Sequence, residues 1–131
     1  MKIFTELVKL NGDNIDIGCP EENIQDAIKF SYELNNKRIR VVKGWHWLDV
    51  CFSDKHLSII NLEGLLPSLI ICQDLIFDSR LFLTTSGGRV RSSLLQKFHS
   101  EYSVFETANS HYILSGIGER KIVPADMIFN I

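Results

Sequence analysis

A series of short apolar runs after Pro67 constrains the fold of this sequence more than any other feature. The first run, residues 69–77, is apolar enough to lie in the centre of a sheet. Shorter runs separated by turn residues follow at 89–98, 102–107, 110–115 and 120–123. Short strands at this spacing are typical of an antiparallel meander or a small barrel. Residues 67–131 are therefore predicted to be rich in β-structure.

The clearest helix is predicted over residues 20–35. Pro20 suits the first helical position, because the N–H that proline lacks would have no partner there. Glu21 and Glu22 follow at the positive end of the helix dipole. One face carries small and apolar side chains, namely Ile24, Ala27, Ile28, Ser31 and Leu34. This pattern predicts an amphipathic helix.

Together these regions predict one α+β domain over residues 1–131, with a helix-containing part at 1–66 and a β-rich part at 67–131. We expect one main helix packed on an antiparallel sheet, or a small, partly open β-barrel, formed mostly by the C-terminal half. Four further elements are predicted before Pro67: a helix over 2–10, a strand over 38–43 that Gly44 ends, a strand rather than a helix over 45–52, and a loop or short helix over 55–66.

The composition predicts a cytoplasmic protein. The chain has 131 residues, which fits one domain, and 45% of them are apolar. Its three cysteines, Cys19, Cys51 and Cys72, are an odd number without a CxxC motif, so we expect three free thiols. The first six residues lack the apolar core of a signal peptide, and no apolar run approaches the roughly 20 residues that cross a bilayer. We therefore expect no membrane association.

Several blocks in the second half share a pattern with other sequences. They are Asp78-Ser79-Arg80, Val90-Arg91-Ser92-Ser93-Leu94, the run from Phe105 to Leu114, and the run from Gly116 to Lys121. Over about residues 66–123 the chain resembles a family of small uncharacterised bacterial proteins with the pattern V-R-T-S-x-L, F-x-T-x-N-T-x-Y-x-L and G-x-G-x-R. Ser92 and Ser110 replace threonines of that pattern and keep the hydroxyl. The resemblance implies no activity.

Polar residues near the turns of this segment are the candidate binding residues: Arg91, Glu106, Asn109, His111 and Arg120. If the protein is a small enzyme, its polar site is expected near Arg91, Glu106 and His111. The competing interpretation is structural. Asparagine favours turns and arginine offers five donors, so these side chains would hold the β meander together. No catalytic, cofactor or metal-binding motif is present, so we expect no cofactor and no metal.

Three local patterns are assigned structural roles. Gly116 and Gly118 lack the third glycine of a dinucleotide fingerprint, because Lys121 stands in its place, so they are predicted to form a hairpin turn. Ser86-Gly87-Gly88 is predicted to be another turn. Cys51 and His46 have the residue types of a thiol nucleophile and its base. On a strand they point to opposite faces, so Cys51 is predicted to be a buried structural cysteine.

A basic run lies beside two tryptophans and raises the alternative of single-stranded nucleic-acid binding. The residues concerned are Lys37, Arg38, Arg40, Lys43, Trp45 and Trp47. The preferred interpretation is two core tryptophans beside a solvated strand face. The formal net charge of −2 also lacks the basic excess of a duplex-binding domain, so we do not expect nucleic acid as a partner.

These observations favour recognition without catalysis. The predicted function is a small cytoplasmic bacterial module that binds a macromolecule, with another protein as its partner. Many bacterial proteins of this size are immunity proteins or mobile-element accessory factors, which is an argument by class.

Overall fold

The computed structural model describes residues 14–80 and 88–128. The elements in chain order are β1 (Asn14–Ile17), η1 (Glu21–Asn23), α2 (Ile24–Leu34), β2 (Arg38–Cys51), α3 (Asp54–Leu62), β3 (Ser68–Asp78), β4 (Gly88–Arg91), β5 (Leu95–His99), β6 (Val104–Thr107), β7 (Ser110–Leu114), β8 (Ile117–Pro124) and η2 (Ala125–Met127). The expected α+β class is confirmed. The helix predicted over 2–10 and the first two residues of the turn predicted at 86–88 lie outside the described residues.

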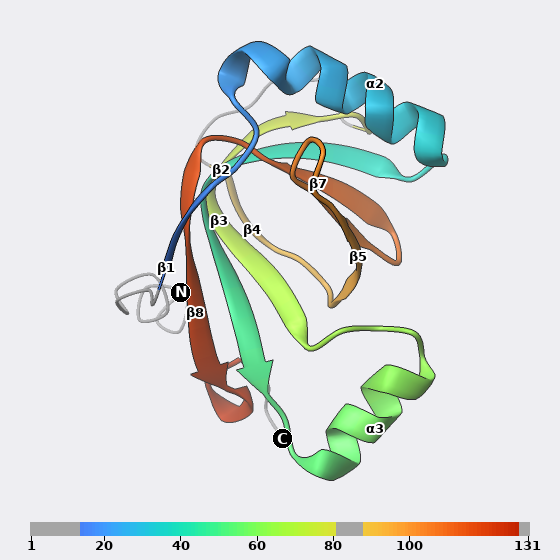
Figure 1. Cartoon of the computed structure of the whole chain (residues 1–131), viewed down its shortest axis with the longest axis vertical. Coiled ribbons are helices and arrows are strands. Elements are labelled where there is room, and N and C mark those ends of the chain that lie inside the picture. The colour runs from blue at the N-terminus through green and yellow to red at the C-terminus, as the bar shows by residue number, and fades with distance from the viewer. Residues whose placement is uncertain (1–13, 81–87, 129–131) are drawn as a thin grey trace.

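The long strand β2 is the centre of the sheet (Figure 1). β3 runs antiparallel along one edge of β2, from Arg40 opposite Asp78 to Asp49 opposite Ser68. β7 and β8 both run parallel to β2 along its other edge. The sheet is therefore mixed, whereas an antiparallel sheet was expected. The central strand also comes from the N-terminal half, although six of the eight strands, β3 to β8, follow Pro67.

Two glycines alter the predicted strand boundaries. Gly44 has a φ of 60°, which favours glycine, but β2 continues through it because pairing with β3 resumes at Trp45. The strand predicted over 45–52 is confirmed as far as Cys51. Gly116 has a φ of 70° and separates β7 from β8. These two strands do not pair with each other, so the hairpin predicted there is wrong: the glycine kinks a chain that keeps following β2.

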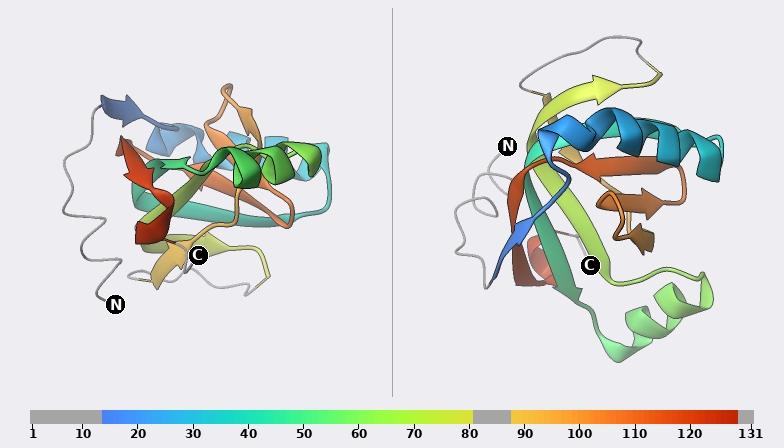
Figure 2. Two further views of the ribbon diagram at one scale, coloured as in Figure 1. Left: turned by 90° about the horizontal axis from the view of Figure 1, so that it is seen from below. Right: turned by 45° about the horizontal axis from the view of Figure 1, so that its top comes forward.

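The helix α2 covers one end of the sheet, as the two further views show (Figure 2). It buries Ala27 and Ser31, and its apolar face packs with Ile39, Val41 and Ile113 from β2 and β7. The amphipathic helix predicted over 20–35 is confirmed, with its first turn wound as the 3₁₀ helix η1. A core on the opposite sheet face holds both tryptophans, as expected.

The second helix, α3, lies at the other end of the molecule (Figure 1). Ser53 caps it by accepting a hydrogen bond from the backbone N–H of His56. This agrees with the loop or short helix predicted over 55–66. Within the described part of the chain, neither helix has the length and apolar character needed to cross a membrane.

Candidate functional site

Glu106, one of the predicted site residues, is the buried centre of a polar cluster. The cluster joins the end of α2 to three strands, and we call its members the Glu106 cluster: Asn35, Lys37, His99, Glu106 and His111. Glu106 is only 7% exposed. Lys37 Nζ lies 2.6 Å from Glu106 Oε2, and Asn35 Nδ2 donates to the same oxygen at 3.0 Å. His99 Nε2 lies 2.8 Å from Oε1.

These donors keep Glu106 ionised. Burial by itself would raise the pKa of Glu106, but hydrogen bonds from Lys37, His99 and Asn35 outweigh it and lower the pKa to about 2. An ionised carboxylate only accepts hydrogen bonds, so His99 Nε2 carries a hydrogen and donates it. Glu106 therefore connects α2 to β5 as a structural anion.

His111 belongs to the same cluster but has a different environment. Its side chain is fully buried, and Nε2 lies 3.5 Å from Glu106 Oε2. Neither ring nitrogen has a hydrogen-bond partner among the described residues. Burial lowers the pKa of His111, although Glu106 opposes this effect. His111 is consequently a neutral core histidine that a substrate could not touch without movement of the strands.

Arg120 lies in a second polar group, together with Asp49. Its Nε and Nη2 donate to the two oxygens of Asp49 at 2.7 and 3.1 Å, and its guanidinium lies 4.6 Å from the Trp47 ring centroid. Ser68 and Trp47 also donate to Asp49. Burial opposes ionisation of Asp49, but the bonds from Arg120 and Ser68 prevail and lower its pKa. Arg120 thus joins β8 to β2 rather than holding a turn.

The other two predicted site residues lie apart from these groups. Arg91 ends β4, opposite Ile71 of β3, and its Nη1 donates to the carbonyl of Ile128 at 3.4 Å. Asn109 is exposed in the turn between β6 and β7. The structure therefore brings together Glu106 and His111, but the described contacts do not join Arg91 to them.

The basic run that suggested nucleic-acid binding is engaged by carboxylates. Lys37 contacts Glu106, while Arg38 and Arg40 both contact the buried Asp78. The more exposed Lys43 pairs with Glu21 at 3.1 Å. Trp45 and Trp47 are buried, as expected of core tryptophans. A phosphate backbone would have to displace these carboxylates and would find neither indole ring open for stacking.

The three cysteines are free, as predicted. Cys19 and Cys72 are buried, and burial raises the pKa of Cys72 to about 11. Cys51 is exposed at the end of β2, so its predicted burial is wrong. The alternation along β2 places it on the face opposite His46, as expected.

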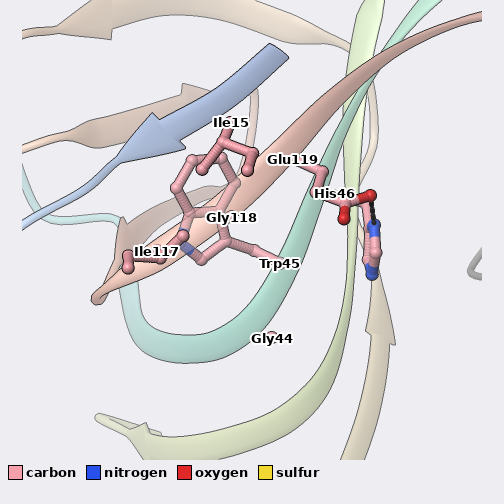
Figure 3. A pocket seen from close by; sticks show the side chains of 7 residues that line it. All are labelled: Ile15, Gly44, Trp45, His46, Ile117, Gly118 and Glu119. Carbon is pink, nitrogen blue, oxygen red and sulfur yellow. Dashed lines mark ion pairs between the residues drawn. The ribbon is translucent and has the colours of Figure 1, made fainter. Parts of the chain in front are cut away.

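The feature that sequence reasoning missed is an open pocket between β1, β2 and β8 (Figure 3). Its volume is about 200 Å³. Ile15 and Ile117 stand at its rim, and His46 and Glu119 form its polar end. Ile15, Ile17 and Ile117 are 73%, 80% and 67% exposed, and we call them the isoleucine patch. The alternation in Ile15-Asp16-Ile17 was the available signal, but it lay in a segment without a predicted strand.

The fold defines a small α+β domain in which a helix covers one end of a mixed, strand-rich sheet. The chain belongs to the family described as a domain of unknown function (DUF6957), whose model matches residues 16–130. This agrees with the expected membership of an uncharacterised family, and the matched range includes most of the N-terminal half. No curated protein and no solved structure matches the chain.

Proposed function

We propose that this protein is a non-catalytic module that binds another protein through the outer edge of β1. The observation that carries the proposal is the isoleucine patch. Ile15 and Ile17 lie on one face of β1, and Ile17 pairs directly with Ile117 of β8. Burying an isoleucine side chain contributes about 1.5–3 kcal/mol, so three exposed isoleucines offer substantial binding energy.

The backbone of β1 supports the same proposal. Within the described residues β1 pairs along one edge only, with β8. The outer edge of such a strand presents N–H and C=O groups to an extended segment of a partner. Main-chain hydrogen bonds would give affinity there, and the isoleucines would select aliphatic side chains.

The buried polar groups favour binding over catalysis. Glu106 and His111, the centre of the enzyme alternative, lie inside the protein, and Glu106 connects α2 to β5. The cations that suggested nucleic acid are paired with carboxylates. A cytoplasmic bacterial protein of the immunity or mobile-element accessory type fits this proposal, and a toxin gene adjacent to its own gene would support the immunity role.

Selection of random extended peptides displayed on phage tests the proposal. We expect the wild-type protein to select aliphatic peptides that bind at least about tenfold more weakly to an Ile15→Ser/Ile17→Ser variant, because two buried side chains are lost. Ile59→Ser/Leu62→Ser is the matched control, since these exposed side chains lie on α3. Equal binding to all three proteins, or no selected peptide, would overturn the proposal. Circular dichroism checks that each variant is folded.

A further inference from the structure

The pocket beside the isoleucine patch has the size of a subsite for one side chain. Its volume of about 200 Å³ lies below the roughly 300–1,000 Å³ of typical small-molecule sites. Its rim is aliphatic, with Ile15 and Ile117, whereas its other end is polar, with His46 and Glu119 (Figure 3). Such a lining suits an occupant with an apolar stem and a polar tip.

The polar end contains a buried imidazole nitrogen without a hydrogen-bond partner among the described residues. His46 is 9% exposed, and its Nδ1 makes no hydrogen bond among the described residues. The nearest charged atom is Glu119 Oε2 at 3.8 Å, which is too long for a direct hydrogen bond. Buried polar atoms in folded proteins nearly always have a partner, so His46 Nδ1 is the atom of this pocket that a bound group would satisfy.

Glu119 keeps the capacity to accept a further hydrogen bond. It is 41% exposed, and its contact with the buried Lys121 Nζ is 3.6 Å long. A carboxylate offers about four acceptor sites, and this long contact leaves most of them open. Glu119 thus adds a negative charge to the open side of the pocket.

We infer that this pocket receives a lysine or arginine side chain of the protein segment bound at β1, with its cationic nitrogen between His46 Nδ1 and Glu119. This inference rests on the proposed function. The methylene stem lies against Ile15 and Ile117, as long basic side chains commonly lie on apolar surfaces. An ammonium nitrogen carries three hydrogens and each terminal guanidinium nitrogen carries two, so either one donates to both acceptors at once.

Other occupants fit this pocket less well. An aliphatic tip would leave His46 Nδ1 buried without a partner, and an anionic tip would meet the Glu119 carboxylate. Burial, with help from Lys121, lowers the pKa of His46, so its imidazole is neutral near pH 7. In the tautomer with the hydrogen on Nε2, Nδ1 accepts a hydrogen bond.

The peptides selected by the wild-type protein provide the test. We expect a basic residue to be enriched at one position next to the aliphatic residues. A synthetic peptide with that basic residue replaced by norleucine should bind about tenfold more weakly to the wild type. On the Glu119→Gln variant, the norleucine peptide should bind nearly as well as the basic parent peptide. This variant has already lost the carboxylate that accepts from the basic side chain, so removing that side chain costs little more. Glu63→Gln, at an exposed glutamate after α3, is the matched control and should behave like wild type.

The outcomes separate the two proposals. Peptides that require Ile15 and Ile17 but show no basic preference would overturn this inference and leave the proposed function standing. An equal effect of norleucine on the wild type and Glu119→Gln would also overturn it. Failure to select any peptide would instead reject binding at the β1 edge, and this inference with it.

Discussion

The Glu106 cluster and the pocket beside the isoleucine patch contain the same residue types in opposite arrangements. Each places a glutamate next to a lysine and a histidine. In the Glu106 cluster the carboxylate is buried, with contacts of 2.6 and 2.8 Å to Lys37 and His99. At the pocket the Glu119 carboxylate is 41% exposed, and it lies 3.8 Å from His46 and 3.6 Å from the buried Lys121, which is not part of the pocket lining.

This difference indicates what each region does. A carboxylate surrounded by short donors stabilises the fold, because its desolvation is offset by charged hydrogen bonds. A half-exposed carboxylate beside an unpartnered imidazole contributes little to folding and keeps its acceptors for another molecule. Residue type by itself therefore does not separate a structural cluster from a binding site; burial and distance do.

Removing the carboxylate of the Glu106 cluster should give the largest effect. Glu106→Ala removes the carboxylate that accepts from Lys37, Asn35 and His99, so we expect the free energy of unfolding to fall by about 1.5–3 kcal/mol. Urea denaturation at pH 7 measures it. Glu119→Ala should cost about 1 kcal/mol or less, because an exposed pair contributes little. Equal losses in the two variants would remove the distinction between the regions.

Acid should destabilise the protein mainly through Glu106. Its pKa is about 2 when folded against 4.5 for the free group, so the unfolded chain takes up the proton first as the pH falls. The stability from Glu106 is complete above about pH 4.5 and is lost toward pH 2, by at most about 3 kcal/mol.

Glu106→Gln cannot titrate at this position and supplies the control for the acid experiment. Between pH 5 and pH 2.5 it should lose less stability than the wild type in urea denaturation. Parallel losses in the two proteins would show that other carboxylates govern acid unfolding.

The floor of the pocket should tolerate little extra volume. A Cβ at Gly118 would lie 2.2 Å from the Trp45 ring, which is buried and donates its indole N–H to the carbonyl of Ser115. We expect Gly118→Ala to lower the free energy of unfolding by about 1–3 kcal/mol through overpacking. Gly88→Ala is the control, because its Cβ would meet Leu75 at an ordinary 3.4 Å. A similar thermal stability of both variants would contradict the close contact.

The smallest expected effects are changes in histidine pKa. Glu106 raises the pKa of His111 and Glu119 raises that of His46, in both cases against the larger effect of burial. Glu106→Gln should therefore lower the pKa of His111 further, and Glu119→Gln should lower that of His46 by a smaller amount. Nuclear magnetic resonance titration of the ring protons measures both. A rise in either pKa would contradict the assigned contacts.

Local patterns predicted individual elements well and their pairing poorly. Pro20 and the apolar face after it identified the main helix, and the apolar run after Pro67 became β3. The pairing of β2 with β7 joins residues 72 positions apart, such as Arg38 and Ser110. The local periodicity of apolar residues indicates a strand but not which distant strand pairs with it. The predicted hairpin at Gly116 failed for this reason: glycine permits a positive φ, but the parallel pairing decides where the chain goes next.

In the candidate site, too, individual residues were predicted better than their contacts. Glu106 and His111 were singled out from the sequence, and they do lie together. Their partners Lys37 and Asn35 come from about 70 residues earlier and carried no signal connecting them to Glu106. Arg91 and Arg120 were grouped with them through closeness to turns, but hydrogen bonds place them with Ile128 and Asp49 instead.

The sequence by itself determined the α+β class, the amphipathic helix, the free cysteines and the burial of both tryptophans, because side-chain period and polarity act over a few residues. The tertiary structure decided which charges are buried in pairs and which surface stays open. Electrostatic strength depends on distance and on exclusion of water, and both arise only when β2 lies beside β3, β7 and β8. The exposed isoleucines of β1 and the open pocket at His46 and Glu119 are consequences of that assembly.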